Sequence, residues 1–451
     1  MRYFLPILLF LSTVLVGCIP DDNNSVVSSD ARVSTFTFVK DTLNPGLTDV
    51  VYKIEHRSDT GLITCRDSLR FGTRLDSVIP LVTYMATPGK VEFVLPDTTI
   101  VSTGIDTMNF NQSPIYLHVT ASDMKTEKWY RINIAAHSVN PNLYVWEKLA
   151  DKIFPDQYAE SKAFYINQQL VLFLNNGLST QLYTSNNGQY WALKSEINTL
   201  PTPCHVRDIV QHEDTLYYIS NNQLYWSNDW IHWQSKDYAT ADFELVNMLL
   251  SYDNKPWCLA QDKTSERLML ATIHGDSIAI EKHIAGLKDG FLPSNFPIND
   301  FAALSFCGSS ERPRAMIVGG RDIEGNIVNS RWNLEYAAND GYRLKDFSIS
   351  QPTFNSLTGV SIIYYNNQFI MFGGTDNDLE WRSNILYSND EGMNWFLPDS
   401  LSNQLPPEYE SRQNQSVVTD AQDNIYIIGG QSHDKTFSDV YRGYLNSAKW
   451  E

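Results

Sequence analysis

Cysteine is scarce in this chain, with five among 451 residues. Cys18 follows an apolar N-terminal segment, which leaves Cys65, Cys204, Cys258 and Cys307 for the rest of the chain. An even number of cysteines permits disulfides in an exported protein. Cys258 and Cys307, however, lie in apolar, strand-like segments, where a buried free thiol is the ordinary state. We therefore expect no disulfide framework.

Basic residues are also few. The chain has 34 Lys and Arg against 52 Asp and Glu, a formal net charge of -18, and no run of basic residues. Such a charge balance repels polyanions, so nucleic acid is excluded as a partner. With 43% hydrophobic residues, a chain of this length can nevertheless bury large cores and should form at least two domains.

Metal-binding patterns are absent as well. The nine histidines are scattered and lack the close spacing of paired metal ligands. The acidic turn 376–378 offers too few ligands for calcium and is better explained as a solvated turn. We expect neither a metal ion nor another cofactor.

The N-terminus has the one segment typical of a targeting signal. Residues 1–17 combine one basic residue with an apolar stretch and end in Gly17 before Cys18, which predicts a lipoprotein signal peptide. Residues 15–18 resemble a bacterial lipobox, and this resemblance implies that Cys18 is acylated and anchors the chain. The alternative is an ordinary signal peptide followed by a chance cysteine.

A polar tether is expected next, over residues 18–30, because this stretch is too poor in apolar residues to pack. Its acidic start resembles the signal that exports Bacteroidetes lipoproteins to the outer face of the outer membrane; alternatively, it is a linker whose Asp residues carry no signal. On the first reading, the protein is lipid-anchored in the outer membrane and faces the cell exterior.

Residues 31–140 show short runs of alternating apolar and polar residues. The clearest runs are 33–39, 49–54, 91–95, 115–120 and 129–134. Such alternation predicts half-buried antiparallel strands. Their number and spacing predict an immunoglobulin-like (Ig-like) β-sandwich domain.

Residues 141–451 repeat one pattern, an apolar strand that ends in paired Gly or Asn residues. Six such strands align when one position is taken as common to all of them: Asn175, Asn221, Gln261, Gly320, Gly374 and Gly430. The copies recur roughly 40 to 60 residues apart, an interval typical of propeller blades. We therefore expect an all-β chain, with an Ig-like β-sandwich followed by a six-bladed β-propeller in which each blade has four strands.

Ring closure has two candidate strands, 143–149 before the first blade and 448–451 at the end of the chain. Only one of them can fill the outer position of the last blade. The sequence leaves this choice open.

A Ser-Asn-Asp turn followed by Gly and Trp accompanies the repeats, most fully at 388–395 and less completely at 185–191 and 227–233. It resembles the Asp-box, which implies a structural hairpin on the outer rim. Together with the Gly-Gly strands, it resembles kelch-type and galactose-oxidase-like propellers. The whole arrangement of lipobox, Ig-like module and propeller resembles an uncharacterised family of Bacteroidetes surface lipoproteins, and this implies binding or glycan handling at the cell surface.

A binding site is expected on the axial face of the propeller, where loops from all blades meet. The loops of blades four to six are long, at 286–299, 321–330, 375–383, 399–415 and 431–438, and should build one wall of a pocket. The candidate ligand-binding residues are Arg207, Asp300, Arg321, Trp381, Arg382, Tyr409 and Arg412. Arg binds carboxylates and Trp stacks on sugar rings. The alternative is that these Arg residues bridge blades and that Trp381 packs on its own loop.

Enzymatic alternatives lack their sequence signatures. A sialidase-like glycoside hydrolase needs an Arg triad and a Phe-Arg-Ile-Pro motif, and residues 311–314 match that motif poorly. Cys204, His205, Tyr409 and His433 could face one another as in a copper oxidase, but no neighbouring Tyr-His pair is present. We expect a monomeric, non-catalytic surface protein that binds a glycan or a partner protein, with a carbohydrate-active enzyme as the alternative.

Overall fold

The structure is a computed structural model that describes residues 27–66, 68–155, 157–238, 240, 242–275, 277–308, 312–348, 356–378, 385–397 and 405–446. The chain divides between Asn140 and Pro141 into two compact units. The predicted signal peptide, Cys18 and most of the tether lie outside the described residues. Among the residues that are described, no helix has the length and apolar character that a membrane span requires.

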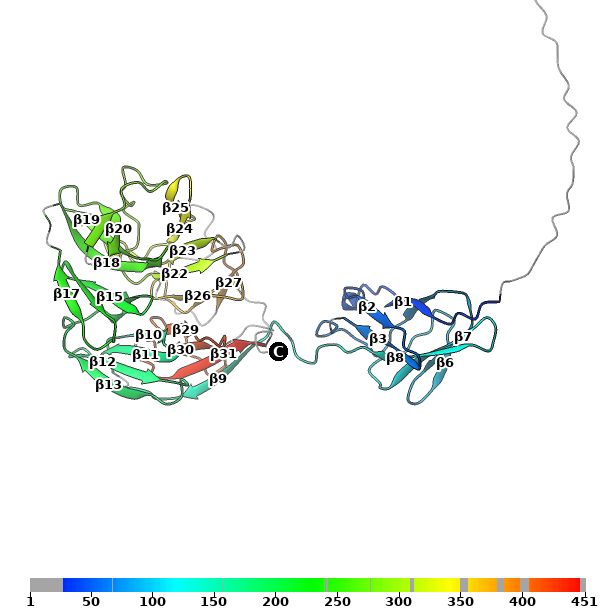
Figure 1. The fold of residues 1–451 in the computed structure, drawn as a ribbon. Helices are drawn as coiled ribbons and strands as arrows, with labels where there is room; N and C mark the ends of the chain where they lie inside the picture. The colour runs from blue at the N-terminus through cyan, green and yellow to red at the C-terminus, as the bar shows by residue number, and fades with distance from the viewer. Residues whose placement is uncertain are drawn as a thin grey trace, which may run out of the picture. The chain divides into compact units, whose positions relative to one another are not determined.

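The N-terminal unit contains two β-sheets (Figure 1). One pairs β1 (Val33–Phe38) with β4 (Pro80–Tyr84). The other has the strand order β2-β3-β8-β7-β5-β6. Its strands are β2 (Tyr52–Glu55), β3 (Thr60–Cys65), β5 (Pro88–Val94), β6 (Thr99–Val101), β7 (Ile115–Ala121) and β8 (Glu127–Asn133), and a short 3₁₀ turn, η1, spans Pro45–Leu47.

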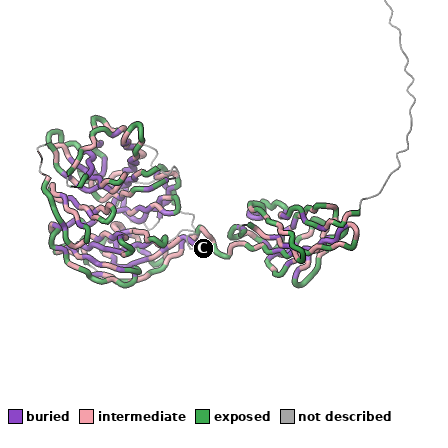
Figure 2. The backbone as a smooth tube through the Cα atoms, viewed as in Figure 1, coloured by how far each residue is buried: buried purple, intermediate pink, exposed green. Residues whose placement is uncertain are grey.

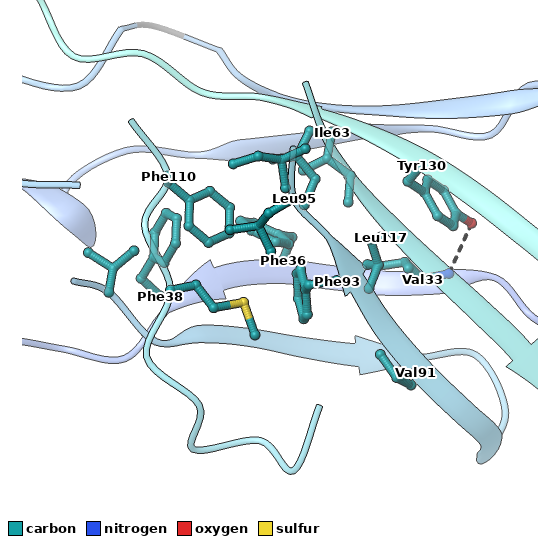
Figure 3. Close-up of a cluster of buried hydrophobic side chains, with 14 of the residues drawn as sticks. Val33, Phe36, Phe38, Ile63, Val91, Phe93, Leu95, Phe110, Leu117 and Tyr130 are labelled. Atoms are coloured by element: carbon teal, nitrogen blue, oxygen red, sulfur yellow. Dashed lines mark hydrogen bonds between the residues drawn. The ribbon is translucent and has the colours of Figure 1, made fainter. Parts of the chain in front are cut away.

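The expectation of purely antiparallel pairing is wrong at one place, because β3 and β8 are parallel. These strands are far apart in the sequence, so no hairpin constrains their direction. The alternating strands do bury one face, as predicted. Phe36, Phe38, Phe93 and Phe110 pack into one core, where the Tyr130 hydroxyl accepts a hydrogen bond of 3.1 Å from the Val33 amide (Figure 3).

The second unit is a β-propeller, and its described residues form six sheets. The sheets are, in chain order, β10 (Glu160–Ile166), β11 (Gln169–Asn175), β12 (Thr180–Ser185) and β13 (Ala192–Ile197); β14 (Val210–His212), β15 (Thr215–Ser220), β16 (Gln223–Ser227) and β17 (Gln234–Asp237); β18 (Phe243–Tyr252), β19 (Lys255–Asp262), β20 (Leu268–His274) and β21 (Ser277–Ile280); β22 (Ala302–Cys307), β23 (Pro313–Val318), β24 (Arg331–Ala337) and β25 (Gly341–Asp346); β26 (Ser361–Tyr365), β27 (Gln368–Phe372) and β28 (Leu386–Ser388); and β29 (Ser416–Thr419), β30 (Ile425–Ile428), β31 (Val440–Leu445) and β9 (Tyr144–Ala150).

The six predicted apolar strands are confirmed as the second strand of each sheet: β11, β15, β19, β23, β27 and β30. They are mostly buried because neighbouring sheets pack on both of their faces, and Figure 2 shows buried residues running along these strands. Gly320 follows β23 with a φ of 102°, and a Cβ there would lie 2.7 Å from the Asn299 carbonyl oxygen. The Gly pair is therefore required by close backbone approach.

One predicted strand is reduced in the fifth sheet. The expected outer strand at 394–397 is a single bridge between Tyr387 and Phe396. Cys307 also differs from expectation. It is exposed because it ends β22 and points away from the face on which Phe306 is buried, whereas Cys258 is buried as predicted.

The ring is closed by the N-terminal strand of the unit. β9 pairs with β31 in antiparallel register, so that Trp146 lies opposite Gly443 and Tyr144 opposite Leu445. The last sheet thus takes one strand from the start of the unit and three from its end. The competing candidate, 448–451, lies outside the described residues.

The three Asp-box-like turns share one hydrogen bond, from the Trp indole to a backbone carbonyl three residues earlier. In the fullest copy, the Gly392 amide donates to Ser388 Oγ, the Asn394 amide donates to Asp390 Oδ1, and Trp395 Nε1 donates to the Gly392 carbonyl, at 2.8 to 3.0 Å. The same tryptophan bond recurs from Trp191 and Trp233. These turns are structural, because their polar atoms are used within the hairpins.

Candidate ligand-binding site on the propeller axis

A cavity of about 440 Å³ lies on the axis of the propeller. It is lined by residues of β10, β14, β22, β26 and β29, the first strands of five sheets. A second cavity of about 340 Å³ shares part of this lining and adds residues of β18. All six inner strands therefore contribute, and the volume of each cavity is in the range of small-molecule sites.

A short 3₁₀ turn, η2 (Val206–Asp208), places two charged side chains at this cavity. Val206 is fully buried in the core between the first two sheets and holds the turn against β10. Arg207 and Asp208 then line both cavities. Lys162 of β10 joins them, and its Nζ donates a hydrogen bond of 2.9 Å to the Arg207 carbonyl oxygen.

The Arg207 guanidinium lacks a counterion among the described residues. Its Nη1 is buried and has no hydrogen-bond acceptor, and no carboxylate of the described chain forms an ion pair with it. A buried, unsatisfied cationic donor is costly and is rarely tolerated without a reason. Arg207 is thus the side chain in the cavity with the greatest unused binding capacity.

Burial shifts the ionisation of the two neighbouring groups in opposite directions. It raises the pKa of Asp208 to about 6, with a further contribution from the negative charge of Glu160. It lowers the pKa of Lys162 to about 8, assisted by the positive charge of Arg207. Both shifts follow from enclosure in a space that solvates charge poorly. The axis therefore holds groups that titrate near neutral pH.

Two further acidic groups near the axis already have partners. Glu160 Oε1 lies 2.9 Å from His205 Nδ1, and this hydrogen bond raises the pKa of His205 to about 9. Asp300 lines the larger cavity, and its carboxylate lies 3.5 Å from Arg321 Nε. Arg321 also donates to the Gly325 carbonyl oxygen at 3.0 Å. Of the predicted residues, Arg207 and Asp300 therefore line the cavity, and Arg321 pairs with Asp300.

Arg412 and Tyr409 occupy a different place from the one predicted. Arg412 is 1% exposed, its Nη1 lies 2.6 Å from Asp439 Oδ1, and its guanidinium lies 4.3 Å from the centre of the Tyr409 ring. Tyr409 is buried as well. A buried ion pair and aromatic packing engage these two side chains, and neither of them lines the axial cavity.

The remaining two candidates, Trp381 and Arg382, lie outside the described residues. The cationic lining of the cavity comes from β10 and η2, in the first two sheets, whereas Asp300 is contributed by the segment before β22. Lys162 was missed by the sequence analysis. Its signal was a single lysine within the otherwise mainly apolar strand 161–166.

A copper or other metal site does not form in the described part of the chain, where no three His, Cys, Asp or Glu side chains gather in a way that could hold an ion. Cys204 is buried, and burial raises the pKa of its thiol to about 12. His205 is engaged by Glu160. The cavity therefore offers recognition by charge and hydrogen bonding.

Comparisons with known proteins support the two-part organisation. A family model described as "DUF6242 beta propeller domain" matches residues 140–451, and one described as "Domain of unknown function (DUF6242) N-terminal domain" matches residues 24–134. A similar solved structure, described as "Structure of YjhT", has 12% sequence identity and a TM-score of 0.47, and the match covers 65% of this chain and 96% of that chain. A search of curated proteins found no match. The chain belongs to the DUF6242 family, with its N-terminal domain and its C-terminal β-propeller.

Proposed function

We propose that this protein is a binding protein of the cell surface whose propeller takes a glycan, or a segment of a partner protein, into its axial cavity. Each of the six sheets is one blade of a kelch-like ring in this proposal. The observation that carries it is Arg207, a cationic side chain with an enclosed, unsatisfied Nη1 at a cavity of about 440 Å³.

The lining of the larger cavity supports a polar ligand with an apolar face. Ser161, Ser305 and Ser361 contribute hydroxyl groups, while Tyr165 and Tyr364 contribute aromatic rings. Sugars present hydroxyl groups together with apolar ring faces, and aromatic side chains complement such faces. This combination favours a glycan over a purely apolar molecule.

In this proposal, the N-terminal residues hold the propeller at the cell surface. The mature protein is held by an acylated Cys18 in the outer membrane and faces the exterior, and residues 31–140 form an Ig-like module that spaces the monomeric propeller from the membrane. The polar tether and the lipobox-like residues 15–18 support this arrangement.

Glycan arrays incubated with residues 19–451 test the binding function, with Arg207→Gln as the variant. Binding that is lost in Arg207→Gln and kept in Arg343→Gln supports the axial site. Arg343 is a suitable control because it lies on the outer strand β25 and pairs with Asp340. Equal binding by both variants would place the ligand elsewhere.

A carbohydrate-active enzyme is the second candidate, and the raised pKa of Asp208 favours it, because a carboxylic acid with a pKa of about 6 suits general acid catalysis. Against a sialidase-like site, Arg207 is the only described arginine that lines either axial cavity, whereas that chemistry uses three. Turnover of sialosides or other glycans by residues 19–451, lost in Asp208→Asn, would replace the binding proposal.

Lipid attachment is tested by Cys18→Ala followed by membrane fractionation. The proposal expects the native chain in the membrane fraction and the variant in the soluble fraction. A variant that stays with the membrane would show that Cys18 is not the anchor.

A further inference from the structure

We propose that the ligand of the axial cavity is a sugar acid, whose carboxylate is bound by Arg207 and Lys162 while its hydroxyl groups contact the polar lining. This inference rests on the proposed binding function and narrows it to one chemical class.

The charged groups around the cavity do not balance one another. Within the described residues, the Asp300 carboxylate is paired with Arg321, and Glu160 is paired with His205. Lys162 and Arg207 have no carboxylate within ion-pair distance in that same part of the chain. Asp208 interacts with the charges of Lys162 and His205. With the Asp300–Arg321 and Glu160–His205 pairs counted as neutral, the lining has two cations, Lys162 and Arg207, against the single carboxylate of Asp208, in a chain of net charge -18.

Lys162 and Arg207 are neighbours in the cavity lining. The Lys162 Nζ donates to the backbone oxygen of Arg207, which places the Lys162 ammonium beside η2, within range of the Arg207 charge. A guanidinium with free donors binds the two oxygens of a carboxylate in parallel, and a nearby ammonium adds a third donor. A bound carboxylate would supply the acceptor that Arg207 Nη1 lacks.

The cavity lining also contains acceptors for the hydroxyl groups of a ligand. Asn414 and Gln415, which precede β29, also line the cavity, and their Oδ1 and Oε1 atoms are acceptors without a donor among the described residues. Gln415 is fixed in this orientation because its Nε2 donates to the Phe372 carbonyl oxygen at 2.7 Å. Unsatisfied acceptors favour a ligand that is rich in hydroxyl donors. A carboxylate and several hydroxyl groups on one small molecule define a sugar acid.

Matched ligand pairs test this inference by calorimetric titration of residues 19–451. The pairs are glucuronate with glucose and galacturonate with galactose, each as the monosaccharide and as a short oligosaccharide. A dipeptide with a free C-terminus supplies a carboxylate without a sugar. We expect the acids to bind at least tenfold more tightly than the neutral sugars and the dipeptide, as one charge-assisted contact provides.

The variants are Arg207→Gln, Lys162→Gln and the control Arg343→Gln. Arg207→Gln should weaken binding of the acid and abolish its preference over the matched neutral sugar, Lys162→Gln should reduce this preference, and Arg343→Gln should keep it. Circular dichroism and melting of each variant establish that it is folded.

The titrations distinguish a wrong sugar-acid assignment from a wrong binding function. Equal binding of acid and neutral sugar, with no effect of Arg207→Gln on the acid, overturns the sugar-acid assignment and leaves a glycan-binding propeller. Binding of the dipeptide as tightly as the acids overturns the sugar part and points to a peptide terminus. Absence of binding by every probe, on the array and in titration, overturns both.

Discussion

Arg412 is the clearest case of a residue whose role is set by burial. Its guanidinium pairs with Asp439 and lies 3.8 Å from the centre of the Phe437 ring. We expect Arg412→Met to lower the free energy of unfolding of the propeller by up to about 3–5 kcal/mol, because the buried Asp439 carboxylate is then left with only the Lys148 ammonium, 4.0 Å away. Urea unfolding measures this loss.

The control for that measurement is Arg343→Met, which removes an exposed ion pair with Asp340. Its cost should stay below about 1 kcal/mol. Equal costs for the two variants would contradict the structural role of Arg412.

Asp208 makes stability depend on pH. Because its pKa is raised to about 6, the folded state holds its proton more tightly than the unfolded state, and the free energy of unfolding should fall as the pH rises from about 4 to about 7. Glu160, Lys162 and His205 surround it and act on the same pKa. Asp208→Asn should therefore be more stable than the native chain at pH 7.5, by up to about 3 kcal/mol.

At pH 4, where the native carboxyl is largely protonated, Asp208→Asn and the native chain should be equally stable. Thermal unfolding at both pH values checks the difference. A stabilisation of the same size at pH 4 and pH 7.5 would show that the charge of Asp208 is not its cause.

At the residue scale, prediction from sequence was limited by side-chain direction. The sequence could place Arg207 and Asp300 on the axial face, because their positions relative to the repeated strand were readable. It could not tell that Arg412 turns inward to Asp439, since this depends on a partner 27 residues away. Nor could it show that Lys162, within β10, faces the axis rather than a neighbouring sheet.

At the element scale, the closing pair of strands can be tested through Gly443 and Trp146. A Cβ on Gly443 would collide with the Trp146 ring across the β31–β9 pair. We expect Gly443→Ala to lower the free energy of unfolding by about 1–3 kcal/mol. In a Trp146→Leu background, where the ring is absent, the same substitution should lower it by at least 1 kcal/mol less. Urea unfolding of the four chains gives the coupling energy.

Gly392→Ala is the matched control for this cycle, because its Cβ would meet Met316 of β23 and not Trp146. Its cost should be the same in both backgrounds. If the coupling energy between Gly392→Ala and Trp146→Leu is as large as that between Gly443→Ala and Trp146→Leu, then Trp146→Leu affects the propeller beyond the β31–β9 pair.

Repeated elements were easier to predict than unrepeated ones. All six apolar strands of the propeller were found because each copy supports the register of the others. In the N-terminal unit, where nothing repeats, β3, β4 and β6 were missed and the parallel pairing of β3 with β8 was not foreseen. Strand direction depends on contacts far apart in the sequence, which local alternation does not encode.

At the scale of the whole molecule, the two units should unfold separately. The core of the N-terminal unit is formed only by residues up to Ala136, and the described cores of the propeller begin at Tyr144. Calorimetry of residues 27–451 should give two transitions that are reproduced by the separate fragments 27–140 and 141–451. A single transition, or a fragment that fails to fold, would mean that the units stabilise each other.

The pairing of β9 with β31 also fixes the order in which the protein can mature. β9 emerges first, but its partner in the sheet is made roughly 300 residues later, which takes about 15–60 s at ordinary rates of synthesis. During that time β9 has no strand partner, and strands with unpaired backbone groups recruit other chains. β9 becomes paired only when β31 has been made. A chain interrupted before residue 440 therefore leaves β9 unpaired, and cellular quality control can recognise such a strand.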